Sequence, residues 1–343
     1  MRKIVVHRPG SYERLRLEEH PEPRPGPSEV LIETEAVGVN YADVVVRMGL
    51  YASARTYVGW PITPGFEVAG RVRSLGEGVT DLEVDEPLLG VTRFGGYASH
   101  LVIPRRQLFR RPRGWSATQA AGFPSVFLTA YHALHELAHP RPEAKVLVHS
   151  AAGGVGGALL QLGRIAECSQ IGVVGGSHKV ATAEKLGADV VIDKSTRRLW
   201  PEVERSAPDG LDIVFDANGV ATLRQSYRHL APTGRLVVYG FHSMLPRSGG
   251  RPRWLKLAWD YLRTPRFNPL DLTNDNRSIL AFNLSYLFER LDLLDEGMTR
   301  LLEWADEGRL QPLPTTSYPL TQVAAAHRDI ESGRTVGKLV LIP

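Results

Sequence analysis

The sequence contains one cysteine, Cys168, among 343 residues. A single cysteine cannot form an internal disulfide, and it excludes a zinc site built from clustered cysteines. The 11 histidines include no HExxH-like or closely paired arrangement. Since histidine pairs and cysteine clusters are the usual ligands of protein-bound zinc, the sequence predicts no metal site.

Long apolar runs are also absent. The N-terminal segment MRKIVVHRPG has no apolar core of the signal-peptide kind, and no apolar run approaches the length of a membrane span. We therefore expect a cytoplasmic protein. The formal net charge is only +4, which is too small to predict nucleic-acid binding without a concentrated basic patch.

Glycine is concentrated in one stretch, KVLVHSAAGGVGG at 145–157. An apolar strand enters this stretch, and an apolar helical pattern leaves it and continues to about Ala166. Strand, glycine turn and helix in this order predict a dinucleotide site, with the pyrophosphate at the helix N-terminus. Gly153 would let the backbone approach the pyrophosphate, and Gly156 would let the helix pack closely on the strand. Ala151 stands where the strict motif has its first glycine.

Strands and helices alternate after this turn. Apolar strands are expected at 171–174, 190–192, 211–215 and 235–239, and helices at 179–186 and 220–230. Such alternation predicts an α/β fold with a parallel, doubly wound sheet. It also weakens the alternative of a glycine turn that binds nothing.

Residues 1–125 have a different texture. Short β-like runs are separated by Pro- and Gly-rich turns such as PEPRPGP, which is typical of an all-β or barrel-like region. A helical pattern at 117–137 could connect this region to the glycine motif. Since 343 residues exceed the usual size of a single core, two domains are expected. Helices at 255–262 and 291–307 and a strand at 338–342 are expected near the end.

The end of the second strand, VVGGSHK at 173–179, predicts the cofactor. An NAD site usually has Asp or Glu there to hold the ribose 2′-hydroxyl, and this strand end has neither. Gly175 leaves room, Ser177 offers a hydroxyl and Lys179 offers a cation, which suits the 2′-phosphate of NADPH. Lys194, after the third strand, could add a phosphate contact. Either lysine could instead be solvated.

Five motifs together resemble the zinc-free quinone oxidoreductases of the medium-chain dehydrogenase/reductase superfamily, which include zeta-crystallin-like proteins. They are NYADVVVRMGLY (40–51), PITPGFEVAG (61–70), GGYASHLVIP (95–104), AAGGVGG (151–157) and VGKLVLIP (336–343). Two later segments, 253–267 and 276–287, are similar to the vesicle amine transport protein 1 branch.

This resemblance implies a GroES-like β-barrel catalytic domain at 1–125, completed by 269–343. A Rossmann NADP-binding domain would be inserted at 126–268. It implies a homodimer as well, formed through the outermost strand of the nucleotide-binding sheet. The strand expected at 235–239 is our candidate for that strand, because pairing removes the liability of an exposed apolar edge.

Zinc dehydrogenases of the superfamily place cysteine where Asn40 stands and histidine where Phe66 stands. Neither asparagine nor phenylalanine is a practical zinc ligand, so the resemblance implies zinc-independent hydride transfer from NADPH to a quinone or α,β-unsaturated carbonyl. Asn40 and Tyr51 are the catalytic candidates. Tyr51 could donate a hydrogen bond to a carbonyl or could serve only in packing. Asp43 is better explained as a structural acceptor than as a proton donor.

The cofactor contacts expected from the motifs and the resemblance are Asn40, Thr129, Ala152, Gly153, Gly154, Val155, Gly175, Ser177, Lys179, Lys194, Asn218, Gly240, Phe241, Phe282, Asn283 and Lys338.

Three other functions stay open at this point. The first is a zinc alcohol dehydrogenase, against which Asn40 and Phe66 argue. The second is a non-catalytic NADPH-binding protein that acts through partners or membrane surfaces, supported by the basic, tryptophan-bearing segment 247–267. The third is a structural, crystallin-like role. The segment 247–267 itself could form a mobile lid, rest on an anionic surface, or pack its apolar side on the body of the protein.

Overall fold

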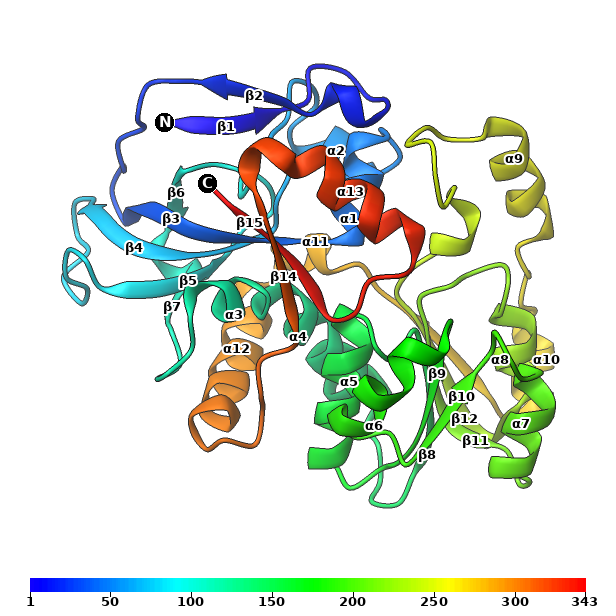
Figure 1. The fold of residues 1–343 in the computed structure, drawn as a ribbon. Helices are drawn as coiled ribbons and strands as arrows, with labels where there is room; N and C mark the ends of the chain where they lie inside the picture. Colours follow the sequence, from blue (N-terminus) through cyan, green and yellow to red (C-terminus); the bar gives the residue numbers. More distant parts are fainter. The chain divides into compact units, whose positions relative to one another are not determined.

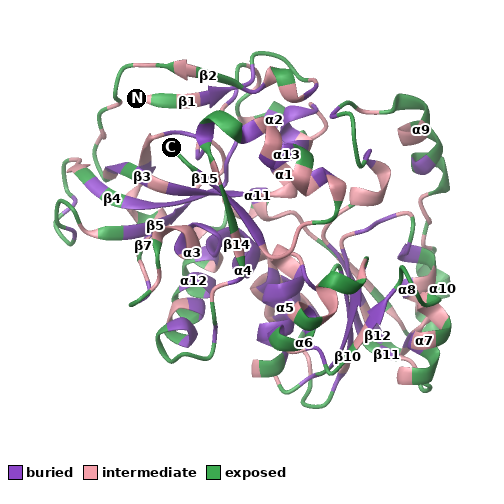
Figure 2. Cartoon of the chain, in the orientation of Figure 1, coloured by how far each residue is buried: buried purple, intermediate pink, exposed green.

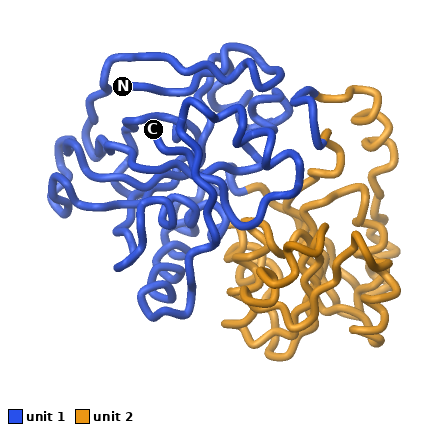
Figure 3. The backbone as a smooth tube through the Cα atoms, viewed as in Figure 1, with its two compact units in different colours: residues 1–128, 247–251, 284–343 blue, residues 129–246, 252–283 orange.

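The computed structural model describes all residues from 1 to 343. The chain divides into two compact units (Figure 3). Unit 1 comprises residues 1–128, 247–251 and 284–343, and unit 2 comprises residues 129–246 and 252–283. These limits differ from the expected ones mainly at 269–283, because the expected catalytic domain includes these residues and the structure places them in unit 2.

Unit 2 is built on a six-stranded parallel sheet in the order β10-β9-β8-β11-β12-β13 (Figure 1). Numbered along the chain, this is the order 3-2-1-4-5-6 of a doubly wound dinucleotide-binding sheet, which confirms the prediction from strand–helix alternation. The strands are β8 (Lys145–His149), β9 (Ser169–Val174), β10 (Val190–Asp193), β11 (Leu211–Asp216), β12 (Leu230–Val238) and β13 (Ser278–Ala281).

The edge of this sheet is not where the sequence placed it. Arg235 to Val238 of β12 pair with Ser278 to Ala281 of β13, so β12 is an interior strand and the prediction of an edge at 235–239 is wrong. Strand β13 has only four residues, begins with Ser278 and directly follows Arg277, so its apolar signal in the sequence is weak. Its pairing with β12 explains why 269–283 belongs to unit 2.

Helices connect the strands of unit 2. The strands that they flank are mostly buried (Figure 2). Leu147, Val214 and Leu236 of these strands are fully buried in the apolar core of unit 2. The helices are α5 (Gly154–Ile165), α6 (Val180–Leu186), α7 (Leu199–Ser206), α8 (Leu223–Arg228), α9 (Trp254–Arg263) and α10 (Pro269–Asp275). Helix α4 (Pro124–Tyr131) runs from unit 1 into a π-helical segment, η3 (His132–Ala138).

Unit 1 contains a mostly antiparallel seven-stranded sheet and a separate hairpin (Figure 1). The sheet order is β14-β15-β3-β4-β5-β7, and β6 pairs with β3 beside β15. The strands are β1 (Arg2–Val5), β2 (Arg16–Glu19), β3 (Glu29–Val39), β4 (Glu67–Leu75), β5 (Pro87–Val91), β6 (His100–Pro104), β7 (Leu108–Arg110), β14 (Thr315–Pro319) and β15 (Lys338–Ile342).

The α-helices of unit 1 lie between and after these strands. They are α1 (Tyr41–Arg47), α2 (Ala52–Tyr57), α3 (Ala117–Ala121), α11 (Leu284–Leu287), α12 (Leu291–Asp306) and α13 (Val323–Ser332). Alternating residues of β3 and β4, including Ile32 and Val68, are buried with Leu341 of β15 in one apolar core. This alternation is the period-2 pattern of a strand with one face in the core.

None of the helices combines the length and the apolar character needed to cross a membrane.

Candidate functional site

The glycine turn of unit 2 closes tightly over the end of β8. A Cβ atom at Gly156 would lie 2.3 Å from the carbonyl oxygen of Ser150, so only glycine allows α5 to begin so close to the turn. Gly153 is the N-cap of this 12-residue helix. The first N–H groups of a helix have no partner within it, so those of Gly154 and Val155 point out of the helix N-terminus. A pyrophosphate is the kind of ligand that such an end binds.

Asn218 adds an unpaired hydrogen-bond donor at the carboxyl end of the parallel strands, where the glycine turn also lies. It follows β11, the neighbour of β8, and the order of connections reverses between these two strands. Its side-chain carbonyl accepts a hydrogen bond from Ser150 Oγ at 3.4 Å, whereas its Nδ2 is buried without a partner. Buried donors are nearly always satisfied, and dinucleotides bind at this reversal point. The site therefore fits a ligand that carries an acceptor.

The turn that holds Asn218 is fixed by the buried carboxylate of Asp216. Asp216 accepts hydrogen bonds from the backbone N–H groups of Asn218 and Gly219 at 2.8 and 3.1 Å. It accepts two more from the hydroxyls of Thr222 and Ser226 at 2.7 and 2.9 Å. Sequence reasoning did not single out Asp216, although an aspartate that ends a buried strand was visible at this position.

Gly240 and Phe241, both expected cofactor contacts, come next to this turn. A Cβ atom on Gly219 would lie 2.7 Å from Cδ1 of Phe241, so a glycine there lets the segment after β12 approach the segment after β11. Phe241 is 46% exposed. Its ring is therefore an apolar surface at the carboxyl edge of the sheet, next to the Asn218 turn.

The expected 2′-phosphate site contains a carboxylate that sequence reasoning missed. Asp193 ends β10 in register with Val174, the last residue of β9. Ser177 Oγ donates to Asp193 at 2.5 Å, and Ser195 donates through its N–H and Oγ at 2.9 and 2.6 Å. These bonds, that of Ser177 foremost, hold the pKa of Asp193 below its usual range. The Ser177 hydroxyl proton is thus committed to Asp193.

Gly175 and Lys194, two of the expected cofactor contacts, lie close together beside Asp193. The Cε atom of Lys194 would lie 3.7 Å from a Cβ atom on Gly175, so the lysine stem lies along the glycine. Lys179 is the N-cap of α6, the helix that follows β9. The two lysines add two positive charges to a strand end at which Asp193 contributes one negative charge.

Unit 1 holds a buried polar cluster around Asn40. Its Nδ2 donates to Glu67 Oε1 at 2.7 Å, and its Oδ1 accepts from Lys338 Nζ at 2.7 Å. Glu67 is fully buried and also accepts the N–H of Ser125 at 2.8 Å. A Cβ atom on Gly38 would lie 2.3 Å from Glu67 Oε1, so glycine at that position makes room for the carboxylate.

Lys338 donates all of its hydrogen bonds within this cluster. Its Nζ donates to Glu67 Oε1 at 2.7 Å, to Asn40 Oδ1 at 2.7 Å and to the carbonyl oxygen of Val39 at 3.0 Å. An ammonium has three N–H donors, so all are engaged and none is left for a cofactor in this arrangement. This geometry favours a positioning role for Lys338 over the expected cofactor contact. Asn40 keeps one N–H for a ligand.

Asp43 ties the two motifs of this cluster together. Its carboxylate accepts the N–H of Asn40 and the N–H of Gly65, each at 2.8 Å. Burial raises its pKa to about 7, against the lowering effect of these bonds. The structural role expected for Asp43 agrees with this geometry, because one fully buried carboxylate spans residues 40 and 65.

Tyr51 lies in an aromatic cluster with Phe66 and Phe94. The centroid of the Tyr51 ring lies 5.8 Å from that of Phe66 and 6.4 Å from that of Phe94, both edge-on. Packing is therefore one of its roles. Phe66, where zinc dehydrogenases have histidine, is only 6% exposed and belongs to the apolar core of unit 1.

The remaining expected residues lie near the π-helical segment η3, directly after β13, and in the glycine turn. The Phe282 ring lies 4.8 Å from the His132 ring, and burial lowers the pKa of that histidine. Thr129 lies one helical turn before His132, and Asn283 follows Phe282. Ala152 is buried within the glycine turn.

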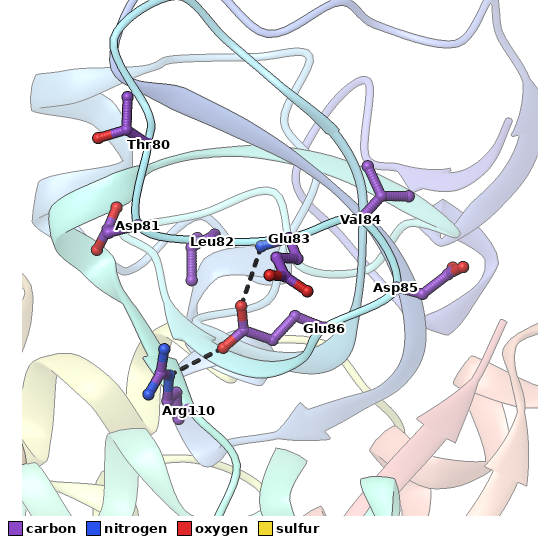
Figure 4. Close-up of a pocket in the computed structure, with 8 residues that line it drawn as sticks. All are labelled: Thr80, Asp81, Leu82, Glu83, Val84, Asp85, Glu86 and Arg110. Atoms are coloured by element: carbon purple, nitrogen blue, oxygen red, sulfur yellow. Dashed lines mark hydrogen bonds and ion pairs between the residues drawn. The ribbon is translucent and has the colours of Figure 1, made fainter.

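The structure contains no group of three or more histidine, cysteine or acidic side chains that could hold a metal ion. A surface hollow lies elsewhere, on the turn before β5 (Figure 4). There Glu86 accepts from Arg110 at 2.9 Å and from the N–H of Glu83 at 3.1 Å, so its carboxylate is already paired. The hollow contains none of the expected site residues.

Comparisons with known proteins agree with this architecture. An alcohol dehydrogenase GroES-like domain matches residues 26–113, and a zinc-binding dehydrogenase domain matches residues 186–341. The chain is 32% identical over 345 residues to the synaptic vesicle membrane protein VAT-1 homolog of Rattus norvegicus, covering 100% of this chain and 84% of that protein.

Two further proteins are similar over nearly their whole lengths. The 2-haloacrylate reductase of a Burkholderia species is 29% identical over 349 residues, covering 99% of this chain and 98% of the reductase. The crystal structure of Escherichia coli quinone oxidoreductase complexed with NADPH has a TM-score of 0.86 and 26% identity, and 100% of each chain is covered.

The chain belongs to the medium-chain dehydrogenase/reductase superfamily, in its quinone oxidoreductase-like branch together with the VAT-1 homologues. The expected combination of a GroES-like domain and a Rossmann-type parallel sheet is confirmed. The protein is therefore an oxidoreductase of this superfamily by its fold.

Proposed function

We propose that this protein is an NADPH-dependent, zinc-independent reductase that transfers hydride to a quinone or an α,β-unsaturated carbonyl. The observation that carries the proposal is the buried, unpaired Nδ2 of Asn218 beside the glycine turn, at the reversal point of a doubly wound sheet. The likeness to a quinone oxidoreductase with NADPH and to a 2-haloacrylate reductase supports the reaction class.

The cofactor would be held by residues of unit 2. The N-terminus of α5 at Gly154 and Val155 would bind the pyrophosphate, and Asn218 would donate to an acceptor of the cofactor. Lys179 and Lys194 would attract the 2′-phosphate against the opposing charge of Asp193. When bound, NADPH would supply the hydride, and the protein would supply orientation and a dry site.

The substrate would be oriented by unit 1. The Asn40 amide is held at both ends by Glu67 and Lys338, which fixes the direction of its remaining N–H. That N–H can donate to the oxygen of a quinone or enone, where negative charge develops during the reaction. The product oxygen takes its proton from water. Tyr51 stays a candidate for a second donor.

Zinc independence and dimer formation are parts of the same proposal. Phe66 is a core residue and the Asn40 amide is already bonded to its neighbours, so neither position offers a metal ligand. The exposed edge of β13 would pair with its counterpart in a second copy, because an unpaired strand edge is a site for association.

The test is an assay of NADPH oxidation with a panel of acceptors that includes benzoquinone, phenanthrenequinone and an aliphatic enone. We expect the absorbance of the reduced nicotinamide to fall with at least one acceptor. An Asn40→Ala variant should lower kcat, and a fluorescence titration of its affinity for NADPH separates the role toward the substrate from the expected cofactor contact. If the protein binds NADPH tightly and reduces none of the acceptors, the reductase proposal is wrong and the non-catalytic alternative gains support.

A further inference from the structure

Arg93, in the turn after β5, carries a positive charge that no carboxylate of the protein neutralises. Arg110 and Arg111 of the same unit pair with Glu86 and Glu35, whereas no acidic oxygen lies within 4.0 Å of a guanidinium nitrogen of Arg93. Arg93 is partly buried, and its Nε is buried without a hydrogen-bond partner. Its two Nη atoms remain accessible to solvent. Because an unpaired charge that is partly out of water is unfavourable, this position fits an incoming anion.

Two aromatic rings hold the guanidinium of Arg93. Its Cζ lies 3.7 Å from the centroid of the Tyr57 ring and 5.6 Å from that of the Phe288 ring. Stacking covers the flat faces of a guanidinium and leaves its edge, which bears the N–H donors, for a ligand. That edge presents the donors as a planar fork, whose geometry matches the two oxygens of a carboxylate.

The elements that carry these rings are bonded to each other. Tyr57 ends α2, and Phe288 directly follows α11. Ser285 Oγ of α11 donates to Ser53 Oγ of α2 at 2.6 Å, and both residues are buried. The Tyr57 hydroxyl donates to Glu289, which is therefore engaged by the tyrosine and makes no ion pair with the arginine. A site that is fixed in this way binds its ligand with little further loss of conformational freedom.

The same turn adjoins the candidate substrate residues of unit 1. Phe94 directly follows Arg93, and its ring packs edge-on against that of Tyr51, with 6.4 Å between the centroids. The N–H of Thr92 donates to the carbonyl oxygen of Phe66 at 2.9 Å. The cation at residue 93 is thus linked through its neighbours in one bonded turn to Tyr51, the candidate donor to the substrate.

We propose that Arg93 binds a carboxylate of the substrate, so that the acceptor is a quinone or enone carrying a carboxylate away from its reacting group. This inference rests on the proposed function, because it names the substrate class of the same site. The two Nη atoms would donate parallel hydrogen bonds to the carboxylate. The energy of this remote contact would hold the acceptor in place for hydride transfer and thereby raise kcat/KM.

The test compares a naphthoquinone that bears a propanoate side chain with its methyl ester, because the quinone ring is the same in both. The readout is kcat/KM for the acid divided by kcat/KM for the ester, a ratio that cancels general effects on the enzyme. Arg93→Met should lower this ratio about 10- to 100-fold, the range of a charge-assisted contact. Arg93→Lys should give an intermediate ratio, since lysine keeps the charge without the planar fork. The matched control is Arg55→Met, which removes an exposed arginine of α2 and should leave the ratio unchanged.

A further variant tests the site with Arg93 intact. Glu289→Gln should raise the ratio, because it removes a negative charge beside the site while the amide oxygen can still accept from Tyr57. The same ratio in the parent protein and in Arg93→Met, an equal fall in Arg55→Met, or a lower ratio in Glu289→Gln would overturn the proposal. A ratio in Arg93→Lys equal to that of the parent would overturn the role of the planar guanidinium.

Binding of the acid and of the ester is also measured by calorimetry, with protein saturated with NADP⁺, because binding needs no turnover. If neither compound oxidises NADPH, the proposed reductase function is wrong for this class of acceptor, and calorimetry then decides the anion site separately. Tighter binding of the acid than of the ester, lost in Arg93→Met, supports the site. Equal affinities of the parent protein for the acid and the ester overturn it.

Discussion

Replacement of Lys338 by methionine should destabilise unit 1 and leave unit 2 unchanged. The ammonium of Lys338 is the only positive charge within hydrogen-bond distance of the buried Glu67 carboxylate, at 2.7 Å, and both side chains are 3% exposed or less. Methionine has a similar length and no charge. The substitution would therefore leave the buried carboxylate of Glu67 with its hydrogen bonds from Asn40 and Ser125 and without a counter-charge.

The expected cost is about 3–5 kcal/mol, which is typical when one partner of a buried ion pair is removed. The pair itself contributes much less, because burying two charges costs nearly as much as their attraction returns. Consequently the double variant Lys338→Met/Glu67→Gln should recover most of the lost stability. In the double variant the amide of residue 67 can still accept from Asn40, since a glutamine keeps a side-chain oxygen.

Hydrogen exchange measured peptide by peptide is the suitable assay, since it reports the opening free energy of each unit separately. Amides of β3, β4 and β15 should exchange faster in Lys338→Met, while those of β8 and β11 should not change. A cost below about 1 kcal/mol for the single variant, or a double variant less stable than the single one, would refute the electrostatic reasoning.

Three other results are expected. NADPH should bind more tightly than NADH, and Lys179→Ala should reduce the difference in binding free energy by about 1–3 kcal/mol. Asp193→Asn should increase the difference, because the substitution removes a negative charge beside the 2′-phosphate. Equal affinities of the parent protein for the two cofactors, measured by titration, would contradict the predicted preference. Dialysis against a strong chelator should leave the fold and the activity unchanged, because Asn40 and Phe66 do not bind zinc. Stoichiometric zinc in the purified protein, with activity lost when the zinc is removed, would contradict zinc independence. Light scattering at micromolar concentration should give the mass of a dimer, and a lysine in place of the exposed Ala281 of β13 should shift the mass toward that of the monomer. A monomeric parent protein would count against strand pairing.

The nucleotide-binding sheet was predictable because its strands are apolar runs punctuated by glycine and helices. The regular alternation from β8 to β12 is a local signal, and the glycine requirement at Gly156 follows directly from the motif. Strand β13 was missed because it is short and lies far along the chain from its partner, after two helices. Its place in the sheet depends on tertiary pairing, which local periodicity does not report.

The sequence predicted which residue types form the candidate site better than it predicted which of these residues contact one another. The strand end after β9 carries no carboxylate in the sequence, yet Asp193 reaches it from β10 because adjacent parallel strands end side by side. Knowledge of the 3-2-1 strand order would have indicated this residue. The hydrogen bonds of Lys338 to Glu67 and Asn40 join residues 271 and 298 positions apart, and no spacing rule connects them.

The position of β15 in the sheet of unit 1 has a consequence for synthesis of the protein. Strand β3 is made early, but its pairing with β15 and the charge of Lys338 must wait until all of unit 2 has been made. During that interval Glu67, 271 residues ahead of Lys338, has no cation to accompany it into the interior. Unit 2 lacks such a dependence, since its sheet is finished at Ala281. We therefore expect unit 2 to mature first on the ribosome, and unit 1 to stay open and exposed to chaperones until β15 emerges.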